Sequence, residues 1–154
     1  MRDKRCGTDQ LEEAQSYVEE TGIDCLAVAV GTSHGVYKGT PHLEFELLST
    51  LSKEIKIPLV LHGGSGGGDE NLGKAAKTHI CKINVFTDLH DAAKDAMIEA
   101  GFEGKYLPEI DDIAYFAYKD KLKYYLNLFG SAGKAKKYRE IAPLEEGAER
   151  SVLK

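Results

Sequence analysis

Three short strand-like segments, separated by segments of helical period, constrain the fold of this chain more than any other feature. Residues 25–30 form a continuous apolar run, residues 57–61 form a second strand that begins with a proline, and residues 80–86 alternate as a strand does. Apolar residues at helical spacing fill 10–20, 43–55, 69–78 and 88–100, and a further long helix is expected over 111–128. Such alternation favours parallel strands joined by crossover helices. The sequence therefore predicts an α/β fold whose first strand is covered on both faces.

Composition narrows the class of protein. The chain is 42% hydrophobic, carries a formal net charge of -5 and has a pI of about 5.6, with its charges interspersed. It has no basic patch for nucleic acid, and no apolar run approaches the roughly 18 residues that span a membrane. We expect a cytoplasmic protein, with a folded domain over 1–130 and a polar, poorly ordered tail over 131–154.

The cysteines do not suggest a disulfide framework. Cys6, Cys25 and Cys81 form no CxxC motif, and the last two fall in the predicted strands. We expect no disulfide and buried free thiols in the strands.

Two histidines stand at equivalent positions after the first two predicted strands. His34 and His62 are each followed directly by glycine. Imidazoles at neighbouring strand ends can share one metal ion, and zinc suits nitrogen ligands of this kind. His42, His79 and His90 have no such partner and are expected to be solvated.

A glycine-rich turn over residues 63–68 follows the second predicted strand and precedes a predicted helix. Its N–H groups and the Ser65 hydroxyl could bind a phosphate, although a flexible loop would have the same composition. It lacks the Gly-Lys-Ser/Thr of a Walker motif. In barrels of alternating strands and helices the phosphate commonly lies at the last two strand ends, where this turn and residues 84–87 would lie.

Four segments together resemble the class II fructose/tagatose-bisphosphate aldolases over roughly residues 8–135: LAVAVGTSHG from Leu26, PLVLHGGSG from Pro58, KINVFT from Lys82 and FGSAGKA from Phe129. The resemblance implies a (β/α)8 TIM barrel, present here as a partial barrel of about the last three βα units plus the carboxyl-terminal helices. It also implies that Zn2+ is held by His34 and His62. The residues implied to bind the phosphate and enediolate of dihydroxyacetone phosphate are Gly35, Gly63, Gly64, Ser65, Asn84, Val85, Phe86 and Thr87.

Further features follow from the same resemblance. Lys38 would add charge at the rim, and a monovalent cation bound by some members would use carbonyls around Ser33, Gly35 and Gly63. The implied reaction is zinc-dependent cleavage or condensation between a fructose or tagatose 1,6-bisphosphate and the two triose phosphates of glycolysis. The expected partner is a sugar phosphate, and the expected assembly is a homodimer or homotetramer.

Part of the family's site has no match in this sequence. The third histidine ligand and the acid/base aspartate match no segment, so no catalytic residue is identified. No arginine lies between Arg5 and Arg139 to hold the second phosphate. A complete barrel needs at least about 200 residues. Two alternatives therefore stand beside the aldolase: a truncated, non-catalytic remnant that binds phosphate or zinc, and a phosphate-binding isomerase barrel.

Overall fold

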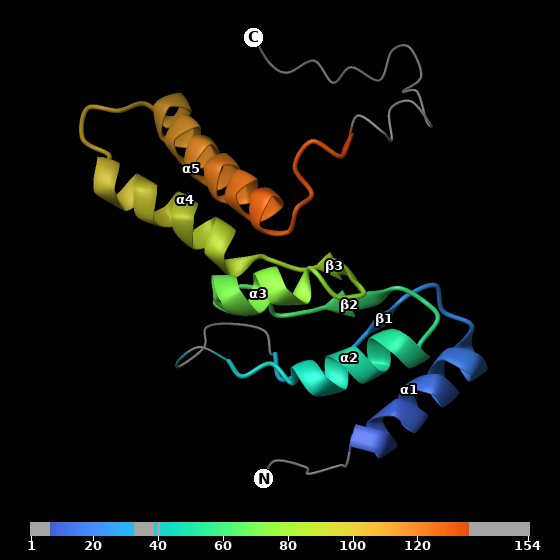
Figure 1. Ribbon diagram of the computed structural model, residues 1–154. Coiled ribbons are helices and arrows are strands. Elements are labelled where there is room, and N and C mark those ends of the chain that lie inside the picture. The colour runs from blue at the N-terminus through green and yellow to red at the C-terminus, as the bar shows by residue number, and fades with distance from the viewer. Residues whose placement is uncertain (1–6, 33–38, 40, 136–154) are drawn as a thin grey trace, which may run out of the picture.

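The computed structural model describes residues 7–32, 39 and 41–135, and it is a three-stranded parallel sheet with five helices around it (Figure 1). The elements follow one another as α1 (Gly7–Thr21), β1 (Leu26–Ala27), α2 (Phe45–Glu54), β2 (Leu59–Leu61), α3 (Asp69–Ala75), β3 (Ile80–Ile83), α4 (Thr87–Ala100) and α5 (Leu107–Leu128). The predicted alternation is confirmed.

The sheet has the strand order β1-β2-β3, with both pairs parallel. Leu26 pairs with Leu59, and Leu59 pairs with Ile80, which sets one row of side chains on the face that carries the core. The next row is Ala27, Val60 and Lys82. Val60 follows Leu59 and Lys82 precedes Ile83, so this row lies on the opposite face, and a register shift at Leu59 and Val60 accounts for the extra residue between Ile80 and Lys82.

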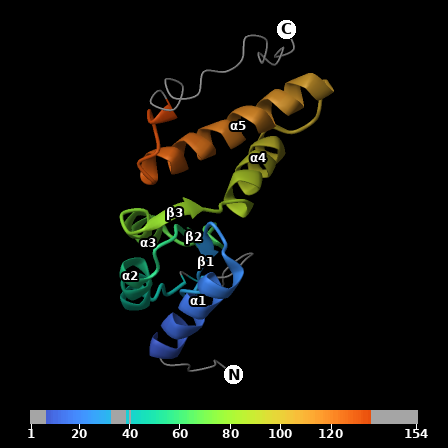
Figure 2. The ribbon, with the colours of Figure 1, turned by 90° about the vertical axis from the view of Figure 1, so that its right-hand side faces the viewer.

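The core lies between one face of the sheet and the helices. Leu48 of α2, Leu72 of α3 and the strand residues Leu59 and Leu61 are fully buried there. Spacing of three and four residues puts Leu48 and Leu51 on one face of α2, which explains why that segment is a helix packed on the sheet. Figures 1 and 2 both place α1 at the β1 side of the sheet and the paired helices α4 and α5 beyond β3.

Helix α5 begins earlier than predicted, at Leu107 rather than at residue 111. Pro108 does not interrupt it because the first turn of a helix needs no N–H from proline. The Glu109 carboxylate also accepts a hydrogen bond from the Tyr106 N–H at 2.8 Å, which supports this early start.

The expectation that the first strand is covered on both faces is wrong. Ala27 and Ala29 are exposed, and so are the thiols Cys25 and Cys81, both of which are free. On the face opposite the core, Ala27 and Ala29 of the first strand remain in contact with solvent, whereas Val60 of the second strand is buried. The predicted buried thiols are therefore wrong as well, whereas the absence of a disulfide is confirmed for these two cysteines.

Among the described helices, none is both long enough and apolar enough to cross a membrane. Residues 136–154, most of the predicted tail, lie outside the described residues, and the division into a domain and a tail stays a prediction.

Candidate functional site

The glycine-rich turn after β2 lies against the segment that joins β3 to α4. The Gly64 N–H donates to the Asn84 carbonyl at 2.9 Å, and the Asn84 N–H donates to the Leu61 carbonyl at 3.0 Å. A Cβ at Gly64 would lie 2.8 Å from that Asn84 oxygen and 2.9 Å from Cγ2 of Ile83. The two segments meet so closely that only glycine fits at residue 64.

Ser65 joins this turn to the start of α4. Its side chain is buried, and its Oγ accepts the N–H groups of Phe86 at 3.1 Å and Asp88 at 3.3 Å. A hydroxyl that accepts two hydrogen bonds still has its own proton to donate. Ser65 can therefore hold the α4 start and also donate a hydrogen bond to a ligand.

Asp88 holds the same turn from the helix side. Its Oδ2 accepts the Gly66 N–H at 3.1 Å and the Tyr125 hydroxyl of α5. Burial raises the pKa of the Tyr125 hydroxyl, and the hydrogen bond to Asp88 raises it further. Tyr125 therefore remains a protonated donor near neutral pH, and α5 is tied to the turn through Asp88.

A cavity of about 420 Å³ opens at the ends of β2 and β3. The residues that line it are Gly63, Ser65, Ile83, Asn84, Val85, Phe86 and Thr87. Every predicted phosphate-binding residue within the described part of the chain lies here, except that Gly64 is buried behind Asn84. Ile83 was not predicted, because a strand residue in an apolar run carries no signal beyond packing.

His62 lies at the end of β2 beside this cavity. Its ring is half-buried, and the Asn84 Nδ2 lies 3.3 Å from its Nδ1 and 3.5 Å from its Nε2. The Asn84 amide can thus donate to an unprotonated ring nitrogen, and the other nitrogen of the neutral imidazole then carries the proton.

The other predicted residues of the first strand end, His34, Gly35 and Lys38, lie outside the described residues, as does Ser33. The pairing of His34 with His62 on one metal ion stays a prediction. In the ranges that the structure describes, no three His, Cys, Asp or Glu side chains are gathered to hold a metal. His42, His79 and His90 are exposed, as predicted.

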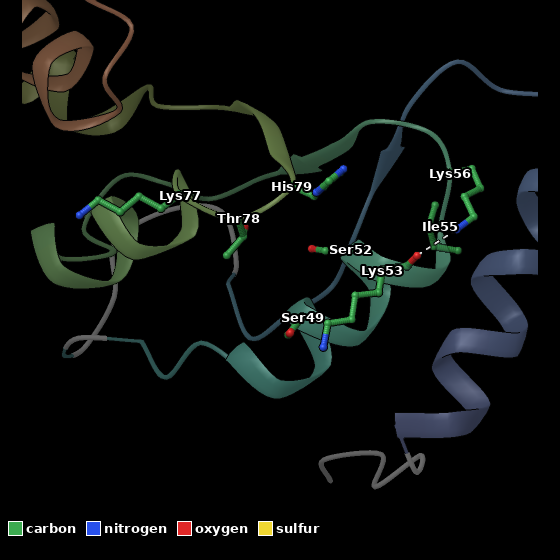
Figure 3. Close-up of a pocket in the computed structure, with 8 residues that line it drawn as sticks. All are labelled: Ser49, Ser52, Lys53, Ile55, Lys56, Lys77, Thr78 and His79. Atoms are coloured by element: carbon green, nitrogen blue, oxygen red, sulfur yellow. Dashed lines mark hydrogen bonds between the residues drawn. The ribbon is translucent and has the colours of Figure 1, made fainter.

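A larger cavity of about 620 Å³ lies at the other end of the sheet, between α2 and the turn that precedes β3 (Figure 3). Two of its hydroxyls are occupied, since Ser52 donates to the Leu48 carbonyl at 2.7 Å and Thr78 to the Ala75 carbonyl at 2.6 Å. Its lysines do not converge, and Figure 3 shows Lys77 directed away from the others. Lys53 lies in the last turn of α2, and Lys56 and Lys77 follow the carboxyl ends of α2 and α3, where positive charge is favourable. The larger cavity is therefore the poorer candidate site.

Comparison with known proteins finds relatives that match most of the chain. The family model described as fructose-bisphosphate aldolase class-II matches residues 2–134. A protein of Escherichia coli K12 named uncharacterized protein YdjI is 39% identical over 124 residues, which are 80% of this chain and 44% of that protein. The crystal structure of the YdjI aldolase superposes with a TM-score of 0.71 at 35% identity, over 80% of this chain and 45% of that one.

A second solved structure supports the same likeness. A putative fructose-1,6-bisphosphate aldolase from Coccidioides immitis gives a TM-score of 0.76 at 25% identity, over 83% of this chain and 45% of that one. The chain thus spans less than half the length of the relatives that it matches.

Proposed function

Since this chain belongs to the class-II fructose-bisphosphate aldolase family, we propose that it supplies the phosphate-binding part of a ketose-bisphosphate aldolase site. In this proposal the chain forms the last three βα units of a (β/α)8 barrel. The reaction is zinc-dependent cleavage or condensation between a ketose 1,6-bisphosphate and two triose phosphates. The observation that carries the proposal is Ser65, which is buried at the cavity and holds the start of α4 while keeping a proton to donate.

The cavity has the chemistry that a phosphate requires. Thr87 begins α4, and the amino end of a helix favours a negative charge. Because the Phe86 and Asp88 N–H groups donate to Ser65, the Thr87 N–H is the group of this first turn that could donate to a phosphate. The glycine-rich turn lets its backbone approach a ligand without a Cβ in the way. The Ser65 hydroxyl adds a side-chain donor on the same side of the cavity, so one phosphate group could contact all three features.

The described residues fit one zinc ligand. His62 lies beside the cavity, and His34 is the proposed second ligand. When bound, zinc would stabilise the negative charge that develops beside the substrate carbonyl. The part assigned to His62 is to present its unprotonated ring nitrogen to the ion, in place of the hydrogen bond from the Asn84 amide.

The carboxylates near the cavity are already engaged in structural contacts. Asp88 accepts from Gly66 and Tyr125, Asp69 accepts from the Tyr124 hydroxyl, and Asp91 pairs with Lys94 at 2.5 Å. We therefore assign none of them as the base that removes the substrate proton. The isolated chain is proposed to bind a phosphorylated triose without turning it over.

Calorimetry tests the phosphate site directly. Dihydroxyacetone phosphate should bind the chain, and dihydroxyacetone without its phosphate should not. Ser65→Ala should weaken binding by about 1–3 kcal/mol, the cost of one missing hydrogen bond to a charged group. Ser52→Ala removes the same hydroxyl from the remote cavity and should leave affinity unchanged. Equal affinity in the two variants would remove Ser65 from the site.

A further inference from the structure

The Tyr125 hydroxyl contacts a charged group next to the candidate phosphate site. It donates to Oδ2 of Asp88 in the first turn of α4, and Thr87, which directly precedes Asp88, lines the cavity. We propose that Tyr125 is a positioning residue, whose hydroxyl holds the Asp88 carboxylate away from the cavity and so leaves the start of α4 to the phosphate of the substrate. The inference rests on the phosphate site of the proposed function.

A carboxylate at this place competes with a phosphate. Asp88 lies in the first turn of α4, and the amino end of a helix attracts any nearby anion. The Thr87 N–H is the donor of this turn that Ser65 leaves for a ligand. An unrestrained carboxylate beside Thr87 could accept that N–H itself and would repel a phosphate group. Phosphate binding therefore requires that the Asp88 charge is held elsewhere.

Two donors hold the Asp88 carboxylate from outside the cavity. The Gly66 N–H donates to Oδ2 at 3.1 Å, and the Tyr125 hydroxyl donates to the same oxygen. Of the described residues that line the cavity, none is Gly66, Asp88 or Tyr125. Both hydrogen bonds thus direct the carboxylate toward the turn and α5, and because its charge strengthens them, they restrain it firmly.

Packing fixes the Tyr125 ring independently of its hydroxyl. The side chain is 5% exposed in the core, its ring centroid lies 5.5 Å from that of Phe129, and Leu128 lies against Gly73 of α3. A buried hydroxyl needs an acceptor, and any backbone carbonyl would serve. The acceptor here is instead the carboxylate that adjoins the cavity. The hydroxyl therefore contributes a restraint on Asp88 that packing alone does not require.

Calorimetry with inorganic phosphate and with dihydroxyacetone phosphate tests the inference. Tyr125→Phe keeps the buried ring and should weaken binding of both ligands by about tenfold, because the released carboxylate would oppose the phosphate charge. Tyr124→Phe is the matched control. Tyr124 precedes Tyr125 on α5 and donates to Asp69 at the start of α3, so its loss should leave the affinity unchanged. Circular dichroism should show both variants folded.

A double variant separates the effect of charge from that of structure. Asp88→Asn removes the charge, and its amide oxygen can still accept the Gly66 N–H. In this background Tyr125→Phe should have no effect on phosphate affinity, whereas loss of a purely structural contact would weaken binding in both backgrounds. Equal affinity of the parent and Tyr125→Phe, or an equal loss with and without the Asp88 charge, would overturn the inference. No binding by the parent chain would reject the proposed function itself, so the two failures are distinguishable.

Discussion

The Ser65 hydroxyl connects local folding to the candidate chemistry. It accepts two N–H groups from the start of α4 and lies in the wall of the cavity. A change at this residue would alter the start of α4 and, in the proposed function, ligand binding as well, so a stability measurement must accompany any binding measurement on a Ser65 variant. The neighbouring Gly64 offers a change that acts through packing alone.

Gly64→Ala is expected to destabilise the fold and to weaken phosphate binding together. Its Cβ would lie 2.8 Å from the Asn84 carbonyl oxygen, so the backbone of Asn84 would have to move away from the turn. Gly73→Ala is the control, because residue 73 lies inside α3 and its Cβ would meet only Leu128 Cδ1, at 3.3 Å. Urea unfolding should show a lower stability for Gly64→Ala than for Gly73→Ala. The reverse order would contradict the close contact.

Tyr125 makes the stability depend on pH in the alkaline range. Its pKa is raised above the ordinary value of 10.0 by burial and by the hydrogen bond to Asp88, so the folded state keeps the proton longer than the unfolded state. This contribution is complete below pH 10 and is lost as the pH rises through the raised pKa. Urea unfolding between pH 8 and 11 should show a decline that is smaller in Tyr125→Phe. Tyr115→Phe, at an exposed tyrosine of α5, should decline like the parent protein.

At the scale of the elements, the sequence predicted the order of helices and strands but not which surfaces they bury. The run 25–30 is apolar throughout, which normally indicates burial on both faces, yet Ala27 and Ala29 are exposed. An apolar sequence shows that a strand is suited to packing on both faces. It does not show whether another element lies against each face. Six residues of the cavity could be predicted from their positions after the strands, because parallel strands bring their ends together. The hydrogen bonds of Asp88 and Tyr125 could not, since α5 approaches the turn from 37 residues away in sequence.

The packing of α2 against the sheet can be tested with two adjacent leucines. Leu48 is fully buried in the core, whereas Leu47, next to it on α2, is partly buried at the edge of the core. Leu48→Ala should cost about 2–5 kcal/mol of unfolding free energy, because it removes a buried side chain and leaves a cavity. Leu47→Ala should cost less. Equal losses by chemical denaturation would show that the two faces of α2 contribute alike to the core.

At the scale of the whole molecule, the described structure brings together the residues expected to bind phosphate and one of the two histidines expected to bind zinc. The turn, the start of α4 and His62 lie together, and Ala27, Ala29 and Lys82 on the sheet face opposite the core are exposed. In the proposed function, phosphate binding would depend on contacts within this chain, whereas metal binding and proton removal would need groups beyond those that the described residues bring to the cavity. Experiments on the chain should therefore detect binding of a phosphorylated triose without cleavage of a ketose bisphosphate.

We expect the isolated chain to cleave fructose or tagatose bisphosphate negligibly, even with zinc added. Proton removal needs a base within hydrogen-bond reach of the substrate carbon. Asp88, which directly follows the cavity residue Thr87, is held by Gly66 and Tyr125 and thus supports the turn instead. A coupled assay for triose phosphate, run on the parent chain and on Asp88→Asn, checks this expectation. Turnover of about 1 per second or more in the parent chain would reveal a base in this chain, and its loss in Asp88→Asn with phosphate binding retained would identify Asp88 as that base.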